Sequence, residues 1–298
     1  MTTRSRAQRR PAGRIPALLG VLILVTACQA GQGTPASDGA SGDADPSVAS
    51  GDGDLLSRVM DAGVLRVANP QTSPPYSFRD ENDAVAGFDV DFANEIGERM
   101  GVDIEFIQGT FDTFIPGLDT DRWDVVIAGQ AITEERLEQV DFSHPYRVSM
   151  VTIFLNCDDD VADVHDLPDL AGRSIAVLAG SSDVERAESV PDAELKTYEN
   201  ATLALTDLDL GRVDSYIGSR FVGTYVAEES GLNVCPTDAA LTLEENAMSF
   251  NKGEEAFKAE MDRLVLEMIE DGTITELSTK WFGPDEDVSD DLLEIIEG

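Results

Sequence analysis

Residues 124–136 read Asp-Val-Val-Ile-Ala-Gly-Gln-Ala-Ile-Thr-Glu-Glu-Arg. The short apolar run Val125–Ala128 is typical of a buried strand. Thr133 predicts the N-cap of a helix that follows it, and Glu134 and Glu135 suit the positive end of that helix dipole. We therefore expect this stretch to pass from a strand into a helix.

The same alternation recurs along the chain from about residue 55 onward. Other short apolar runs are Val64–Ala68, Ile104–Ile107, Ile175–Leu178 and Val213–Ile217. Helical periodicity lies between several of these runs. One clear example has apolar side chains at helical spacing, at Met261, Leu264, Val265, Met268 and Ile269. Gly101 follows another helical pattern as its C-terminal stop. Alternation of this kind predicts an α/β fold with mainly parallel sheets covered by helices.

The N-terminus resembles the signal peptide of a bacterial lipoprotein. Residues 1–27 begin with basic side chains and continue through an apolar stretch from about Leu18 to Val25. That stretch is shorter than the roughly 20 residues that span a bilayer, although an uncleaved anchor helix is the alternative interpretation. Thr26-Ala27-Cys28 resembles a lipobox, which implies a lipidated Cys28. The protein is then extracytoplasmic and held by lipid at the outer face of the bacterial cell membrane.

A flexible linker is expected to follow the lipidated cysteine. Residues 29–53 are almost entirely Ala, Gly, Ser, Asp, Thr, Gln and Pro, with Val48 the only sizeable apolar residue. Such a composition cannot bury apolar surface, so residues 28–53 are assigned to a tether. The folded part then begins at about residue 54, and its length suits one large domain or two smaller lobes.

The chain is strongly acidic. It has 58 acidic and 21 basic residues, a formal net charge of −37, which becomes −42 when the five arginines of residues 1–27 are removed. Nucleic acid is excluded as a partner, because binding phosphate needs clustered cations, and membrane contact is expected through the lipid anchor only. An anionic ligand must therefore be captured by local positive potential. The simplest interpretation of the charge is a solvated surface suited to a saline or alkaline habitat.

Neither a metal nor another cofactor is expected. The two histidines, His144 and His165, do not lie at ligand-like spacing from a cysteine. Beyond Cys28 there are two cysteines, Cys157 and Cys235. They could form a disulfide outside the cytosol, but their spacing does not show whether they meet.

Two strand-to-helix junctions are candidates for ligand binding, because ligands in such folds lie at the carboxyl ends of strands. At the first, Arg136 lies in the first helical turn, where the helix dipole disfavours a cation. Its guanidinium could form a fork for a carboxylate, or a surface ion pair with a glutamate. At the second, Ile175–Gly180 precedes Ser182 and Glu185, which fit a capping box. A ligand contact through Ser182 would be additional to that role.

Several short motifs occur in a fixed order between residues 55 and 283. They are Gly87–Ala93, Phe114–Leu118, Trp123-Asp124, Ile132–Arg136, Asp141–Tyr146, Gly272-Thr273 and Lys280–Gly283. In sequence and spacing they resemble the solute-binding proteins of bacterial ABC importers, in particular the group that binds polar amino acids. No single motif is specific to this family, but the complete series of motifs is.

The resemblance implies a fold of two lobes, the type II fold of periplasmic binding proteins, with a small ligand enclosed between them. Each lobe is a mainly parallel sheet flanked by helices, and two crossings near Arg147–Val151 and Leu243–Ala247 join the lobes. Lobe one would take residues 54–147 and 246–298, and lobe two residues 148–245. Hinge closure around the ligand would give a monomeric receptor that an ABC permease recognises.

The resemblance also implies roles for single residues. Arg136 corresponds to the arginine that grips the α-carboxylate of the ligand, and Gly129 and Ala131 lie on the segment that binds the same end. Ser182 corresponds to a donor from the second lobe, and Phe111 to an apolar or aromatic wall.

Three positions depart from the family pattern. Ser73 stands where an aromatic ring usually covers the ligand, and Tyr76 could supply that wall instead. Ala131 replaces a serine or threonine, which leaves only its backbone N–H to donate. Ser219 replaces the aspartate that pairs with the ammonium of the ligand. The amino end of the site therefore looks altered, and an N-modified amino acid, a quaternary ammonium zwitterion or an organic acid stays open as the ligand.

Two other functions compete with transport. A ligand-sensing receptor would pass its signal to a separate kinase or chemoreceptor. A dehydratase-like enzyme on the same scaffold would need a general acid or base in the cleft. The positions matched to the family site offer serines, Gln130 and Arg136 but no histidine or carboxylate, so we expect no catalytic residues and no enzyme activity.

Overall fold

The computed structural model describes residues 54–283 and 289–297. The predicted signal peptide (residues 1–27), Cys28 and the predicted linker lie outside the described residues. The described part belongs to one compact unit, residues 49–298. It contains no helix that is both long enough and apolar enough to cross a membrane.

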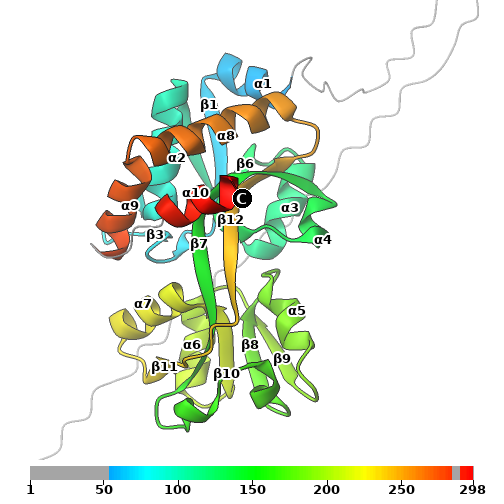
Figure 1. Cartoon of the computed structure of the whole chain (residues 1–298), viewed down its shortest axis with the longest axis vertical. Coiled ribbons are helices and arrows are strands. Elements are labelled where there is room, and N and C mark those ends of the chain that lie inside the picture. The colour runs from blue at the N-terminus through cyan, green and yellow to red at the C-terminus, as the bar shows by residue number, and fades with distance from the viewer. Residues whose placement is uncertain (1–53, 284–288, 298) are drawn as a thin grey trace, which may run out of the picture. The chain divides into compact units, whose positions relative to one another are not determined.

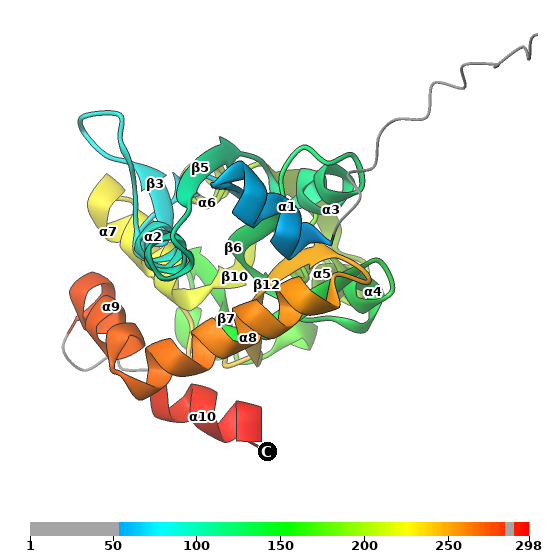
Figure 2. The same cartoon turned by 90° about the horizontal axis from the view of Figure 1, so that it is seen from above.

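The first lobe contains the N-terminal elements and the C-terminal helices (Figure 1). Its N-terminal elements are α1 (Leu55–Ala62), β1 (Val64–Asn69), β2 (Thr72–Ser73), β3 (Ser77–Arg79), β4 (Val85–Ala86), α2 (Phe88–Met100), β5 (Asp103–Gln108), α3 (Phe111–Asp119), β6 (Val125–Ala131) and α4 (Glu134–Leu137). Its C-terminal helices are α8 (Glu255–Glu270), α9 (Thr273–Phe282) and α10 (Ser289–Glu297). Helices α1 and α8 lie side by side although they come from opposite ends of the chain (Figure 2).

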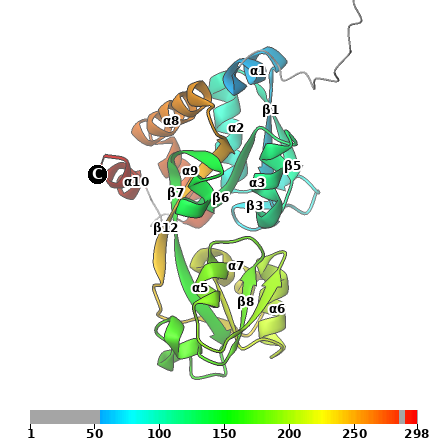
Figure 3. The ribbon, with the colours of Figure 1, turned by 90° about the vertical axis from the view of Figure 1, so that its right-hand side faces the viewer.

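The second lobe contains the middle of the chain. Its elements are the 3₁₀ turns η1 (Val161–Asp163) and η2 (Leu167–Leu170), then β8 (Ser174–Leu178), α5 (Asp183–Glu188), β9 (Glu194–Tyr198), α6 (Ala201–Asp209), β10 (Ser215–Ser219), α7 (Arg220–Ser230) and β11 (Val234–Pro236). Two long antiparallel strands, β7 (Val140–Asn156) and β12 (Thr242–Asn251), run from one lobe into the other (Figure 3). Both expected crossings lie within these two strands.

One large sheet passes through both lobes in the order β5-β1-β6-β12-β7-β10-β8-β9, and β11 pairs with β7. Strands β5, β1 and β6 are parallel in the first lobe, and β10, β8 and β9 are parallel in the second. The pairs that involve β7 and β12 are antiparallel. The predicted α/β fold with two lobes of mainly parallel strands is therefore confirmed.

Local signals in the sequence explain several elements. The apolar residues predicted for one helical face are all buried in α8. Helix α2 ends at Gly101, whose left-handed backbone (φ 72°) lets its N–H bond back to the carbonyls of the last turn. Strand β6 is longer than its apolar run, because Gln130 and Ala131 pair with β12. Strand β10 begins at Ser215, two residues later than the run that predicted it.

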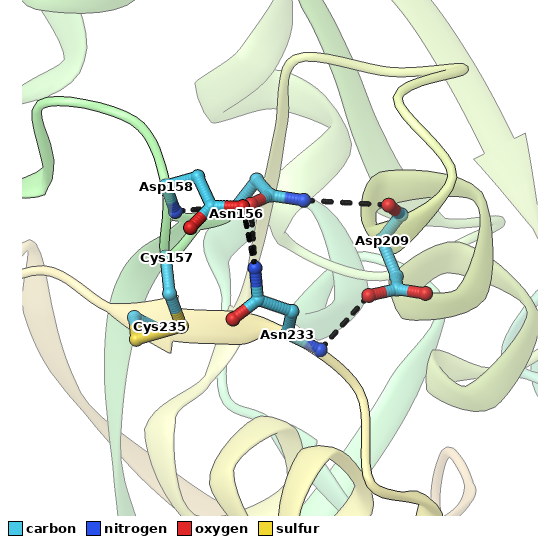
Figure 4. The surroundings of a disulfide bond; sticks show 6 residues. All are labelled: Asn156, Cys157, Asp158, Asp209, Asn233 and Cys235. Carbon is cyan, nitrogen blue, oxygen red and sulfur yellow. Dashed lines mark hydrogen bonds between the residues drawn. A yellow bond between two sulfur atoms is a disulfide. The ribbon is translucent and has the colours of Figure 1, made fainter.

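A disulfide between Cys157 and Cys235 joins the end of β7 to β11 (Figure 4). The backbone N–H of Cys157 donates to the carbonyl of Asn233 at 3.0 Å. The side chain of Asn233 in turn donates to Asn156 Oδ1 and Asp158 Oδ2, both at 3.1 Å. The cysteines are 78 residues apart in sequence, so the bond closes a loop that contains most of the second lobe.

Candidate ligand-binding site

A cavity that contains the expected ligand contacts lies between the two lobes. Its lining includes every residue expected to contact the ligand: Ser73, Tyr76, Phe111, Gly129, Ala131, Arg136, Ser182 and Ser219. Side chains with no expected role also line it, among them Asp89, Arg147, Ser149, Asp183 and Glu244. The cavity offers about 70 Å³ to the centres of water-sized molecules, whereas one water needs roughly 10–15 Å³. It is therefore large enough for a small organic molecule.

Arg136 is placed by the strand-to-helix junction of residues 124–136. Thr133 is the N-cap of α4, as predicted, and its side chain accepts from the backbone N–H of Arg136. The guanidinium of Arg136 donates from Nη1 to the carbonyl of Ala131 at 2.8 Å and from Nη2 to the carbonyl of Gly180 at 3.0 Å. Gly180 belongs to the second lobe, so this side chain connects the two walls of the cavity.

The charge of Arg136 has no direct partner within the described part of the chain. The side chain is only 8% exposed, yet none of the ion pairs among the described residues includes it. The alternative of a surface ion pair with a glutamate is therefore wrong. Burial lowers the pKa of the Arg136 guanidinium, and Glu244 is the first of the nearby carboxylates that oppose this effect. A buried cation of this kind is strongly destabilising unless an anion compensates it.

Gly129 allows a second arginine to approach the cavity wall. Its backbone is left-handed (φ 61°), and a Cβ atom there would lie 1.5 Å from Arg147 Nη2. The Arg147 guanidinium lies 3.7 Å from the centre of the Tyr76 ring and pairs through Nε with Asp89 Oδ1 at 3.3 Å. Tyr146 completes the group, because its hydroxyl accepts from Gly129 N–H and donates to the same Asp89 oxygen.

These contacts define the roles of the two candidate wall residues. Both Ser73 and Tyr76 line the cavity, but one face of the Tyr76 ring already carries the Arg147 cation. Arg147 itself is paired with Asp89, in contrast to Arg136. The two arginines of the cavity therefore differ: Arg147 belongs to a fixed network, and Arg136 is available to an anion.

Ser182 differs from its predicted capping role. It precedes α5 with helical backbone angles (φ −61°, ψ −19°) and makes no side-chain cap. An N-cap usually has an extended backbone, which lets its oxygen reach the first turn, so the predicted capping box with Glu185 is wrong. The Ser182 hydroxyl instead donates to Glu244 Oε1 at 2.6 Å. Its single hydrogen is therefore used within the protein.

Asp183 and Glu244 form an acidic part of the cavity wall with one shared cation. Arg186 donates from Nη1 to Asp183 Oδ1 and from Nη2 to Glu244 Oε1, both at 2.7 Å. Burial raises the pKa of Asp183 to about 6, and the Glu244 charge adds to this, while Arg186 and Arg136 oppose it. Asp183 is thus a carboxylate that the fold largely shields from solvent.

The remaining expected residues have modest roles in the described structure. Ala131 provides the carbonyl that accepts from Arg136. Phe111 begins α3 and packs against Phe114, with ring centres 5.4 Å apart. Ser219 is the N-cap of α7, where its oxygen accepts from the Val222 N–H at 3.5 Å. Ser219 therefore has a structural explanation that needs no ligand.

Sequence reasoning missed the charged residues that come from the connecting strands. Arg147 and Glu244 lie within the expected crossings, and Asp183 directly follows Ser182. These positions in the sequence were the only sign that the three residues would lie near the ligand. Their convergence depends on register. Asn246 pairs with Arg147 across β7 and β12, and the same Asn246 pairs with Ala131 across β6 and β12.

Comparison with known proteins agrees with this geometry. Residues 65–284 match the family described as bacterial extracellular solute-binding proteins, family 3. The chain belongs to this family. This solute-binding protein is 29% identical over 232 residues to the L-cystine-binding protein TcyJ of Escherichia coli strain K12, which covers 78% of this chain and 87% of TcyJ.

Solved structures with the same two-lobe fold include an ancestral arginine-binding protein bound to arginine. It is 34% identical, has a TM-score of 0.71, and the match covers 74% of this chain and 99% of that one. Another is the ancestral amino acid-binding protein AncCDT-1, described as a precursor of cyclohexadienyl dehydratase, at 32% identity, TM-score 0.71, and coverage of 76% and 99%. The curated relatives are binding proteins, and this chain is a binding protein rather than an enzyme.

Proposed function

We propose that this solute-binding protein captures an amino acid or a related small carboxylate between its lobes and delivers it to the permease of an ABC importer. The observation that carries the proposal is the Arg136 guanidinium, which lines the cavity, is buried and has no ion-pair partner among the described residues. A bound carboxylate would supply that charge and accept further hydrogen bonds. The cystine-binding and arginine-binding relatives support an amino acid as the ligand.

The proposed contacts follow from the cavity lining. Arg136 would bind the carboxylate, next to the backbone of Gly129 and Ala131. Phe111 and Tyr76 would form apolar walls, and Ser73, Ser182 and Ser219 would offer hydroxyl oxygens. Because the Ser182 hydrogen is donated to Glu244, Ser182 would contribute as an acceptor rather than as a donor to the carboxylate.

The finer organisation is part of the same proposal. Lobe one would comprise residues 54–147 and 246–298, lobe two residues 148–245, and β7 with β12 the hinge. The protein would be a monomer, held at the outer face of the cell membrane by lipid on Cys28 after loss of residues 1–27. Metabolic labelling with a fatty acid tests the anchor: label on the wild type and none on Cys28→Ser is the expected result.

Thermal unfolding against a panel of amino acids, betaines and small organic acids tests the ligand class. A ligand at 100 times its Kd adds about 2.7 kcal/mol to the free energy of unfolding, which raises the midpoint by several degrees in a protein of this size. We expect at least one amino acid to produce such a rise and Arg136→Ala to abolish it.

The matched control is Arg122→Ala, an exposed arginine of the same lobe that does not line the cavity. It should leave the ligand-induced rise unchanged. A panel in which no carboxylate raises the midpoint, or an Arg136→Ala variant that responds like the wild type, would refute the proposed function.

A further inference from the structure

The acidic part of the cavity wall carries more negative than positive charge. It consists of Asp183 and Glu244, which share the single cation of Arg186. One oxygen of each carboxylate is used by this pairing, and Glu244 Oε1 also accepts from Ser182. The second oxygens, Asp183 Oδ2 and Glu244 Oε2, take part in no hydrogen bond within the described residues. The wall therefore has spare acceptors and a net negative charge.

The donors of this wall are already committed. The Ser182 hydroxyl gives its hydrogen to Glu244, so only its lone pairs are left for a ligand. Arg186 uses both of its terminal nitrogens on the two carboxylates. A ligand group that meets this wall must therefore donate hydrogen bonds and carry positive charge, which describes an ammonium group.

The acidic part of the wall lies in the same cavity as Arg136. Glu244 and Asp183 both raise the pKa of Arg136, so their charges act on its guanidinium. Neither forms an ion pair with it, however, although all three side chains line the same cavity. Opposite charges thus line one cavity without forming an ion pair with one another. An α-amino acid carries a carboxylate and an ammonium on the same carbon, so it could meet both regions at once.

We propose that Glu244 and Asp183, rather than residue 219, hold the α-ammonium of the ligand. The assignment rests on the proposed function of the cavity and deepens it: the ligand is an amino acid with a free primary ammonium. In this arrangement no carboxylate is needed at position 219, because Glu244 on β12 and Asp183 at the start of α5 supply the negative charge. Betaines fit poorly, because they have no N–H to donate and the Tyr76 ring already carries the Arg147 cation.

Calorimetric titration of the full-length protein tests the assignment with matched pairs of probes. The amino acids are L-arginine, L-glutamine and L-cystine. Each is paired with the analogue that lacks the α-amino group: 5-guanidinopentanoate, glutaramate and 3,3′-dithiodipropionate. The variants are Glu244→Gln, Asp183→Asn and, as control, Glu245→Gln, the exposed glutamate next to Glu244 on the same strand.

We expect the wild type to prefer an amino acid over its des-amino analogue. Glu244→Gln should weaken the binding of the amino acid by roughly 30-fold or more, since loss of one partner of a buried charge pair has an effect of that size. The affinity for the des-amino analogue should be unchanged. Asp183→Asn should act in the same direction and Glu245→Gln should have no effect. Cooperative unfolding without ligand, at a midpoint no lower than that of the wild type, would show that the variants are folded.

The outcomes separate the two proposals. If an amino acid binds, Arg136→Ala abolishes binding, and yet Glu244→Gln and Asp183→Asn bind it like the wild type, the ammonium assignment is wrong while the proposed function stands. If Glu244→Gln lowers the affinity for the amino acid and for its analogue by the same factor, the assignment is also overturned. If none of the six probes binds the wild type and no carboxylate of the thermal-unfolding panel raises its midpoint, both proposals are contradicted.

Discussion

Arg136 and Arg147 show how the surroundings of a residue decide its role. Both guanidiniums line the cavity and both are buried. Arg147 is neutralised by Asp89 and stacked on Tyr76, whereas the Arg136 guanidinium bonds, within the described part of the chain, only to two carbonyl oxygens. The sequence marks Arg136 because a cation in the first turn of a helix runs against its dipole. It gives no such sign for Arg147, whose network comes from four separate segments.

Gly129→Ala should be strongly destabilising. A left-handed backbone at an alanine costs about 1–2 kcal/mol, and the added Cβ would overlap Arg147 Nη2. Overpacking adds about 1–3 kcal/mol. Gly101→Ala is the control, because Gly101 has a similar φ of 72° with no atom near its Cβ position. Denaturant unfolding should show a larger loss for Gly129→Ala than for Gly101→Ala; equal losses would mean that Arg147 moves away freely.

Ligand affinity should fall below about pH 6 because of Asp183. Its pKa is raised to about 6, so the carboxylate is ionised above that pH and takes up a proton below it. The charged groups that face it are Glu244, Arg186 and Arg136. If Asp183 helps to hold an ammonium, calorimetry with the amino acid that raises the unfolding midpoint most should give weaker binding at about pH 5 than at about pH 8. Asp183→Asn should make the profile flatter, and an affinity that rises on acidification would contradict the role.

Asp183→Asn should also stabilise the free protein. The folded-state pKa of Asp183 lies above the ordinary pKa of an aspartate, so the folded protein binds this proton more tightly than the unfolded chain does. Stability from this group is therefore present at low pH and lost as pH rises from about 4 to about 6. Asparagine removes a cost of up to about 3 kcal/mol at neutral pH. A higher unfolding midpoint together with weaker ligand binding would mark Asp183 as a residue retained for function.

Among the elements, β7 and β12 contribute most to the site. They bring Arg147, Ser149 and Glu244 into a cavity whose other residues come from both lobes, among them the ends of β6, β8 and β10 and the starts of α2, α3 and α5. The alternation of strands and helices could be predicted from apolar runs, caps and glycines. The register of β12 between β6 and β7 could not, because it pairs residues more than 90 positions apart. Glu244, which that register places in the cavity, was missed for this reason.

The disulfide is the element-scale feature with the clearest energetic consequence. It joins β7 to β11 and closes a loop of 78 residues. Chain entropy predicts a contribution of about 4 kcal/mol for such a loop. Cys157→Ser/Cys235→Ser should lower the free energy of unfolding by a few kcal/mol in urea titrations. Neither cysteine lines the cavity, so ligand affinity should be unchanged at temperatures where the variant is folded.

At the scale of the whole molecule, the net charge is the property from which we predict the effect of salt on stability. The formal charge of −37 implies self-repulsion that salt would screen. Salt also weakens the surface ion pairs, but each of these contributes only about 0–1 kcal/mol. The unfolding midpoint should therefore rise when sodium chloride increases from about 0.01 M to about 0.5 M, over which range the Debye length becomes much shorter. A midpoint that falls would show that the ion pairs outweigh the repulsion.

The two-lobe fold explains why such an acidic protein can bind a carboxylate. A local guanidinium in a water-excluding cavity acts more strongly than the same charge at the surface. The most direct test is a crystal structure with the amino acid that raises the unfolding midpoint most. We expect its carboxylate within about 3 Å of the Arg136 guanidinium, in the cavity between the lobes. A ligand bound elsewhere, or with its carboxylate turned away from Arg136, would contradict it.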